Sequence, residues 1–326
     1  MKIRLLGLAI AGLSLVMTPA FAGEFPDREI TLIVPQTPGG TTDTLSRILA
    51  NAIGKELGKE IVVENRPGAG NTIGMGILAQ ADPDGYTLGV GSQSSLSIAP
   101  LRGLDIKFDA IKSFDPIYNF GDVPNALLVY TDLGPRTLQE LVDYVNEHPN
   151  ELNYGSGGVG STSHFATAMF NAYAKISDNV VHIPYQGGGK LAGGMAAGEV
   201  HYFVGPFSST AVWGQIQAGK IFPLAVAGDK RVASMPDTPT FTEAGMPEYD
   251  NIGWYGMVAP AGTPPEIIAK LNAAGNAAGK SAEVVAALGN MGISTVEITP
   301  EDFATKIKIN LESFTKLVED GVVVIE

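Results

Sequence analysis

The chain has 326 residues, with 34 acidic against 21 basic side chains, a formal net charge of −13, no cysteine and 45% hydrophobic residues. The excess of acid leaves no broad positive surface for a nucleic acid or an anionic membrane. Without cysteine there are no disulfides, thiolate metal sites or cysteine nucleophiles, and the hydrophobic content exceeds that of disordered chains. The length predicts about two domains, each with its own core.

Residues 1–22 have the pattern of an export signal. Lys2 and Arg4 precede an apolar stretch at 5–16, and Ala20-Phe21-Ala22 is a small-x-small cleavage site. The apolar stretch is shorter than the roughly 20 residues of a membrane-spanning helix, and a buried N-terminal helix is the alternative. Cleavage after Ala22 leaves 19 basic and 34 acidic residues, a net charge of −15. Because a lipid anchor needs cysteine at the cleavage site, we expect an exported protein without one.

Strand-like and helical stretches alternate after the signal, which predicts an α/β fold with largely parallel sheets. In the first hundred residues, strands are predicted at 30–35, 61–65 and 86–91, with helices at 43–57 and 72–81 and a glycine-rich turn at 66–70. A strand at 126–130 and strands near Asn153, Val180 and Tyr202 follow. The segment Thr137-Leu-Gln-Glu140 is a capping box that opens a helix ending near Pro149.

The last hundred residues begin with strands at 222–227 and 252–259. Thr263-Pro-Pro-Glu266 and Thr299-Pro-Glu-Asp302 each combine an N-cap with proline and an acidic residue in the first turn, and predict two helix starts. A strand at 322–325 is expected to end the chain. No flexible linker separates the parts, so we expect the chain to cross between two lobes through ordered strands.

Two glycine-rich loops, at 38–43 and 155–162, each lie between a predicted strand and a predicted helix. Glycines let a ligand approach the backbone, and the start of the following helix offers unpaired N–H groups and the positive end of its dipole. Both loops are therefore candidate anion sites that need no lysine or arginine. The alternative is that both are tight turns, with Asp43 and Ser161 as ordinary N-caps.

The sequence lacks the residue patterns that dinucleotide binding, metal binding and serine hydrolysis require. Gly155-x-Gly157-x-x-Gly160 matches a dinucleotide fingerprint, but Gln186 stands after the next strand, where that motif needs an acid. The four histidines have no metal-ligand spacing, so we expect neither cofactor nor metal. Ser161 with His164 leaves a secreted serine hydrolase as an alternative, although no nucleophile elbow surrounds Ser161.

A series of short motifs runs through the chain after the signal: Ile33-Val-Pro35 before Pro38-Gly39-Gly40-x-x-Asp43, Val63-Glu-Asn-Arg-Pro-Gly-Ala-Gly70, Asp84-Gly-Tyr-Thr87, Gly155-Ser156-x-Gly158-x-Gly160-Ser161-x-x-His164, His182-x-Pro-Tyr-x-Gly187, Pro236-Asp-x-Pro-Thr240, Glu243-Ala-Gly245, Trp254-Tyr-Gly256 and Ala259-Pro-x-Gly-Thr-Pro264. In order and spacing they resemble the solute-binding receptors of tripartite tricarboxylate transporters, also called Bug proteins. Asn71, Gln186 and Val204-Gly205 depart from the usual pattern of that family.

The resemblance implies a two-lobed periplasmic-binding-protein fold, type II-like, in which each lobe is a mostly parallel sheet flanked by helices. Lobe 1 is expected at 23–123 plus 227–326, and lobe 2 at 124–226. The implied function is a monomeric periplasmic receptor, not an enzyme, that closes over a di- or tricarboxylate or an aromatic acid and delivers it to a membrane permease. A sensor that presents the ligand to a signalling partner is a further alternative.

The resemblance also implies that the two loops hold a carboxylate from opposite lobes, largely through backbone donors and bridging water. Ser92 and the 205–207 loop are expected at the distal end of the ligand. The full set of expected ligand-binding residues is Thr37, Pro38, Gly39, Gly40, Thr41, Asp43, Ser92, Ser156, Gly158, Val159, Gly160, Ser161, Thr162, Gly205, Pro206 and Phe207.

Overall fold

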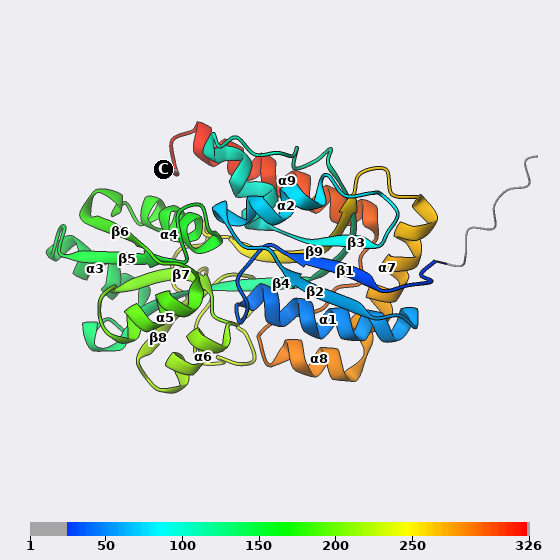
Figure 1. Ribbon diagram of the computed structural model, residues 1–326. Coiled ribbons are helices and arrows are strands. Elements are labelled where there is room, and N and C mark those ends of the chain that lie inside the picture. The colour runs from blue at the N-terminus through cyan, green and yellow to red at the C-terminus, as the bar shows by residue number, and fades with distance from the viewer. Residues whose placement is uncertain (1–24, 325–326) are drawn as a thin grey trace, which may run out of the picture.

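One long strand joins the two halves of the molecule. In the computed structural model, which describes residues 25–324, β4 (Phe114–Tyr130) pairs with β9 (Ile252–Pro260) as far as Pro124. From Asn125 onward it pairs instead with β7 (Tyr202–Pro206) and β8 (Ile221–Val226). Figure 1 shows the two groups of elements side by side, with β4 running between them. The expected crossing through an ordered strand is confirmed.

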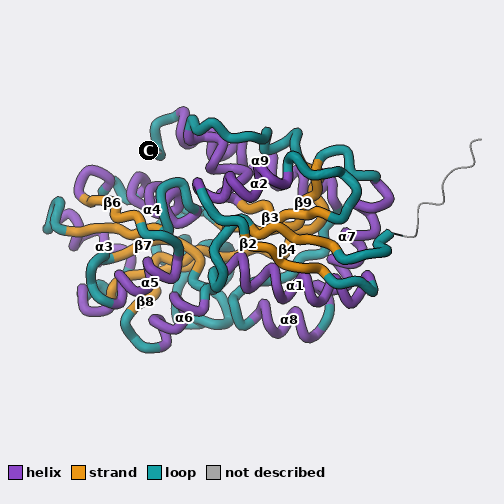
Figure 2. Tube along the Cα trace, in the orientation of Figure 1, coloured by secondary structure: helices purple, strands orange, loops and turns teal. Residues whose placement is uncertain are grey.

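The first half of the sheet has the strand order β2-β1-β3-β9-β4. β1 (Ile30–Val34) lies parallel to β2 (Ile61–Asn65) and to β3 (Thr87–Ser92), whereas β9 runs antiparallel to both β3 and β4. Five helices flank this half: α1 (Thr41–Leu57), α2 (Thr72–Leu78), α7 (Pro265–Lys280), α8 (Ala282–Gly289) and α9 (Pro300–Glu319). Figure 2 shows helices on both faces of the strands, as the buried apolar faces of a central sheet require.

The second half has the order β4-β7-β5-β6, with β8 on β4. β5 (Leu152–Ser156) is parallel to β6 (Val180–Pro184) and β7, while β7 and β8 run antiparallel to β4. The helices of this half are α3 (Leu138–Glu147), α4 (Thr162–Tyr173), α5 (Gly188–Ala196) and α6 (Thr210–Gln217). Short helical turns complete the fold: η1 (Ala69–Asn71), η2 (Gln93–Ile98), η3 (Ala99–Arg102), η4 (Thr131–Leu133) and η5 (Ser177–Asn179).

Four apolar clusters cover the two faces of each half, so the fold is the α/β arrangement of two lobes. The division of the chain into lobes stays a prediction, and α9 packs on both halves. Its Phe303 is buried in a cluster of the first half. Phe314, about three turns later, stacks on Phe165 of α4 with 4.2 Å between ring centroids.

The structure corrects three local predictions. Residues 322–324 form no strand, because Val323 instead packs into the apolar cluster of the second half, and residue 325 lies outside the described part. β4 begins at Phe114 rather than 126, since shifts of register around Tyr118 and Gly121 accommodate the prolines and glycine that obscured its pattern. Thr263 does not cap α7: its hydroxyl donates to the carbonyl of Pro260, and the helix begins at Pro265.

The other predicted helix starts are found. The hydroxyl of Thr299 accepts from the N–H of Asp302 at the start of α9, and Thr137 caps α3 through the N–H of Glu140. The carboxylate of Glu140 accepts from the N–H of Arg136, so the second half of that capping box is displaced by one residue.

The predicted signal peptide at 1–22 lies outside the described residues. Within them, no helix combines the length and apolar character needed to cross a membrane.

Candidate functional site

A cavity of about 720 Å³ lies between the two halves of the molecule. The loops that line it follow the carboxyl ends of β1, β5 and β7, where ligands of open α/β sheets usually bind. Another hollow of about 640 Å³ lies over α1 and β2 and contains none of the loops that the sequence singled out. The cavity between the halves is therefore the candidate site.

The first loop brings the uncapped start of α1 to the cavity. Gly40 is the N-cap residue, with an extended backbone (φ −79°, ψ 171°), and no side chain caps the helix there. The first N–H groups of a helix have no acceptor within it, so those that follow Gly40 are available to a ligand. Gly40, Thr41 and Thr37 all line the cavity.

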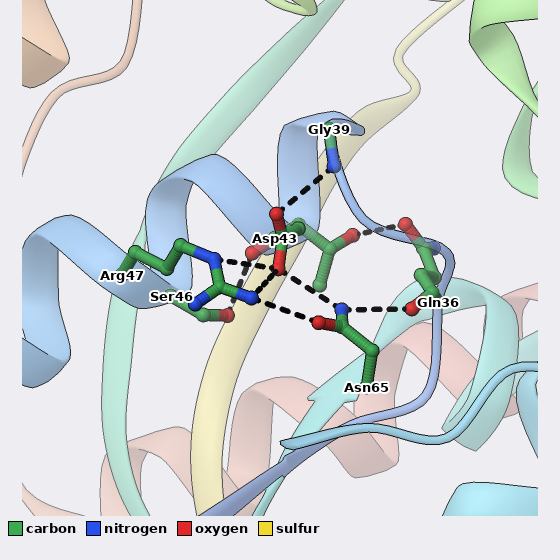
Figure 3. Close-up of polar contacts among 7 residues, drawn as sticks. Gln36, Gly39, Asp43, Ser46, Arg47 and Asn65 are labelled. Atoms are coloured by element: carbon green, nitrogen blue, oxygen red, sulfur yellow. Dashed lines mark hydrogen bonds and ion pairs between the residues drawn. The ribbon is translucent and has the colours of Figure 1, made fainter. Parts of the chain in front are cut away.

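Asp43 lies behind this loop and is not among the cavity-lining residues, and the N-cap of α1 is Gly40 rather than Asp43. Figure 3 shows its carboxylate accepting from the N–H of Gly39 at 2.9 Å, from Nε of Arg47 at 3.0 Å and from Nδ2 of Asn65 at 2.9 Å. Asn65 also donates to the carbonyl of Gln36 at 3.0 Å. Burial acts to raise the pKa of Asp43, but these three donors outweigh it and hold the pKa below its ordinary value. The carboxylate therefore shapes the loop that the ligand would meet.

The second loop brings the start of α4 to the opposite wall. Ser161 is the N-cap, and its hydroxyl accepts from the N–H of His164 at 3.2 Å. This leaves the N–H groups of Thr162 and Ser163, both cavity-lining residues, without an acceptor in the helix. The reading of Ser161 as an N-cap is thus confirmed, and the same helix start faces the cavity.

Two stacked histidines hold the second loop from behind. The rings of His164 and His182 lie 4.1 Å apart, and Nδ1 of His164 accepts from the N–H of Gly160 at 3.2 Å. Only a neutral imidazole has a nitrogen that can accept this bond. Burial, with smaller contributions from the charges of His182 and Arg102, lowers the pKa of His164 to about 4. His164 is therefore neutral at physiological pH.

The same geometry disfavours the serine hydrolase. The His164 ring nitrogen that forms a hydrogen bond faces Gly160, while the Ser161 hydroxyl is engaged by the backbone N–H of His164 and lies 3.1 Å from that of Ser163. A catalytic pair needs the imidazole nitrogen on the serine hydroxyl and an acid that orients the imidazole. The neighbour that stacks on His164 is His182 instead.

The two halves touch on either side of the cavity. The hydroxyl of Ser94 in η2 donates to the carbonyl of Gly160 at 3.1 Å, and that of Ser208 lies 3.5 Å from the hydroxyl of Thr41. These bonds link the first half to the second through both glycine-rich loops. In this structure each glycine-rich loop therefore contacts the opposite half.

Half of the predicted ligand-binding residues line the cavity: Thr37, Gly40, Thr41, Gly158, Val159, Ser161, Thr162 and Pro206. The others do not line it: Pro38, Gly39, Asp43, Ser92, Ser156, Gly160, Gly205 and Phe207. Several of these support the loops. Ser156, which is fully buried, accepts from the N–H of Gly158 at 3.1 Å and bonds His182 at 2.7 Å.

Ser92 and Phe207 are buried for reasons that local patterns do not reveal. Ser92 caps η2 by exchanging hydrogen bonds with Ser95, and Ser94 faces the cavity in its place. Phe207 packs against the ring of Trp213 at 6.2 Å. At the end of β7 it is Pro206, and then Ser209 at the start of α6, that line the cavity.

The sequence reasoning missed one charged residue, Arg102 at the end of η3. It also missed the 67–71 turn and the apolar wall of Leu191, Phe203, Val212 and Tyr255. No motif marks Arg102, which stands in a segment without a predicted element. Its position beside Gly160 arises only from the packing of η3 against the second loop.

Comparison with known proteins places this arrangement among binding proteins. The model of the tripartite tricarboxylate transporter family receptor matches residues 45–321. The periplasmic binding protein BugD is 30% identical, with a TM-score of 0.84 over 92% of this chain and 99% of its own. MatC from Rhodopseudomonas palustris with bound malate is 31% identical, with a TM-score of 0.83 over 90% of this chain and 100% of its own. A second R. palustris protein, with adipate, is 30% identical, with a TM-score of 0.86 over 92% and 99%.

Proposed function

This chain belongs to the tripartite tricarboxylate transporter receptor family, and on that premise we propose that it captures a small organic carboxylate between its lobes and delivers it to a membrane permease. Members of the family are periplasmic solute-binding proteins, so the chain is a receptor and not an enzyme. Its own route to the periplasm would be export through the 1–22 signal and cleavage after Ala22, with no lipid attached.

The observation that carries the proposal is the convergence of two helix starts on one cavity. α1 arrives from the first half without a side-chain cap, and α4 arrives from the second half with two free N–H groups. Each helix start carries roughly half a positive charge and directed donors, the combination that binds carboxylates. An anion between them would join the two halves, so that the closed arrangement would be favoured when ligand is present.

The acidic net charge does not oppose this function. The electric field of the acidic surface residues is screened over about 8 Å at physiological salt, whereas the helix starts act on a ligand at hydrogen-bond distance. Among residues 25–324, no aspartate or glutamate lines the cavity. The relatives solved with malate and adipate suggest that the carboxylate class extends to this chain.

Calorimetric titration with di- and tricarboxylates and aromatic acids tests the proposal, with Gly40→Val as the site variant. An added Cβ at Gly40 meets no atom nearer than 3.8 Å, and its backbone angles suit valine, so the variant should fold. Its side chain would cover the free N–H groups of α1 and abolish binding. Gly214→Val is the matched control, because Gly214 lies in open space on α6 and outside the cavity.

The outcomes separate the site from the function. If no carboxylate in the panel binds the wild-type protein, the proposed function is wrong. If Gly40→Val binds as tightly as wild type, the first loop is only a turn and the ligand lies elsewhere. Melting temperatures of both variants within a few degrees of wild type show that the loss is local.

A further inference from the structure

Arg102 is the only side chain with a full charge in the cavity wall of the described structure. Its side chain lies between the two halves, where two glycines, Gly70 and Gly160, leave room for it. A Cβ at Gly160 would lie 2.4 to 2.6 Å from Cδ, Nε and Nη1 of Arg102, and one at Gly70 would lie 2.7 Å from Nη1. Both glycines have positive φ, 73° and 66°. The side chain is therefore held flat between the 67–71 turn and the second loop.

The guanidinium of Arg102 lacks a partner in the described part of the chain. Its Nε is fully buried and has no hydrogen-bond acceptor, and no acidic residue lines the cavity. Burial alone lowers the pKa of Arg102, with no neighbouring carboxylate opposing the shift. Arg102 is partly buried, and a partly buried cation without a counter-charge is unfavourable, so an anion bound at this point would be stabilised.

A carboxylate held at the two helix starts does not act as the counter-charge of Arg102, because its oxygens already accept hydrogen bonds from the helix starts. A carboxylate has about four acceptor positions. The free N–H groups at the starts of α1 and α4, with the hydroxyls of Thr41 and Thr162, suffice to fill them. The N–H donors on Nη1 and Nη2 of Arg102 then remain without an acceptor, whereas its Nε is buried against Gly160. They form a planar fork suited to a further carboxylate.

We propose that Arg102 binds a second carboxylate of the ligand and makes the receptor selective for diacids over monoacids. The inference rests on the proposed function, since the helix starts must hold the first carboxylate. A diacid binds the two helix starts with one carboxylate and Arg102 with the other, and this second carboxylate is the counter-charge that the Arg102 guanidinium lacks. A monoacid occupies the helix starts alone and leaves Arg102 unpaired.

The test compares straight-chain α,ω-diacids of four to eight carbons with the monoacids of equal length, by calorimetry on the full mature protein. The variants are Arg102→Gln, which removes the charge, and Arg102→Lys, which keeps the charge without the fork. Lys190→Gln is the charge-matched control, because Lys190 is exposed on α5 near the cavity but bonds only Gln186. Thermal melting of each variant establishes that it is folded.

In wild type, the diacid of optimal length should bind at least tenfold more tightly than its monoacid. Arg102→Gln should lower affinity for the diacid at least tenfold, leave the monoacid within about twofold and so remove the preference, whereas Lys190→Gln should change neither. Intermediate affinity for the diacid in Arg102→Lys would support the charge and the fork together, and this readout stands even if the glutamine variant does not fold.

Three results overturn the inference. Equal binding of diacids by wild type and Arg102→Gln makes the arginine structural, and an equal loss for both ligand classes assigns it to the first carboxylate. Wild-type preference for monoacids also contradicts it. In all three cases the proposed function stands, whereas failure of wild type to bind any carboxylate refutes that function instead.

Discussion

Acidification should loosen the second loop through His164. Its folded-state pKa of about 4 lies below the unfolded value of about 6.5 because the ring is buried beside His182 and near Arg102. The unfolded chain therefore binds more protons between these two values. The stability that neutral His164 contributes is complete above pH 6.5 and is lost as the pH falls toward 4.

The size of the effect follows from the shift. The lowering of the pKa from about 6.5 to about 4 corresponds to roughly 3 kcal/mol in total, most of which is lost by pH 4.5. Protonation also removes the acceptor for the N–H of Gly160. Loss of that bond should disturb the turn that precedes the α4 start, so carboxylate binding should weaken over the same pH range.

Urea unfolding at pH 7.5, 6.0, 5.0 and 4.5 measures the change, with His164→Asn as the variant. Asparagine can place an acceptor near the position of Nδ1 but does not titrate. His201, whose pKa burial also lowers, titrates in both proteins, so the difference between them reports on His164 together with its interaction with His182. His148→Asn, at the end of α3, is the control.

Wild type should lose roughly 2 to 3 kcal/mol more than His164→Asn between pH 7.5 and 4.5. Parallel curves for the two proteins would refute the reasoning, because they would mean that His164 has a similar pKa in the folded and unfolded chains. A decline in the His148→Asn control that matches wild type is expected.

Two further predictions concern the support of the loops. Gly160→Ala should lower the free energy of unfolding by about 1 to 2 kcal/mol, because φ is 73° at this residue and the new methyl would displace Arg102. The displacement should also weaken diacid binding. Thermal melting and calorimetry measure the two effects, and an unchanged diacid affinity would contradict the contact between Gly160 and Arg102. Asp43→Asn should cost about 2 kcal/mol in urea unfolding at pH 7, because an acceptor shared by three donors loses its charge. Since the pKa of Asp43 is lowered, this difference should shrink only as the pH falls below about 4, and a difference that vanished near pH 6 would assign it to another group.

Local signals in the sequence were sufficient for most elements and for the general place of the site. The helix start at Thr299 and the Ser161 cap depend on residues within one turn of each other, and so they can be read without the fold. The same holds for glycine-rich loops between a strand and a helix. Because parallel strands end at one edge of a sheet, these loops could be expected near each other.

Within the loops, the direction of each side chain was not accessible from the sequence. Ser92 and Ser94 are two residues apart and both are buried, but Ser92 bonds Ser95 whereas Ser94 bonds the carbonyl of Gly160 and lines the cavity. Asp43 had the pattern of an N-cap or a ligand contact. Its position in the first turn, with Asn65 beside it, instead turned its carboxylate to the back of the loop.

The sequence by itself determined the order of elements, the acidic surface and the two helix starts free of basic residues, since each depends on composition or on neighbours along the chain. Tertiary structure alone decided where the halves join and what completes the cavity. The length of β4 depends on partners more than 70 residues away, and Arg102 reaches the second loop only because the two halves pack there. Contacts between distant segments arise from the packing of whole elements, which no local pattern records. The charge of Arg102 in the cavity wall therefore became visible only in the folded chain.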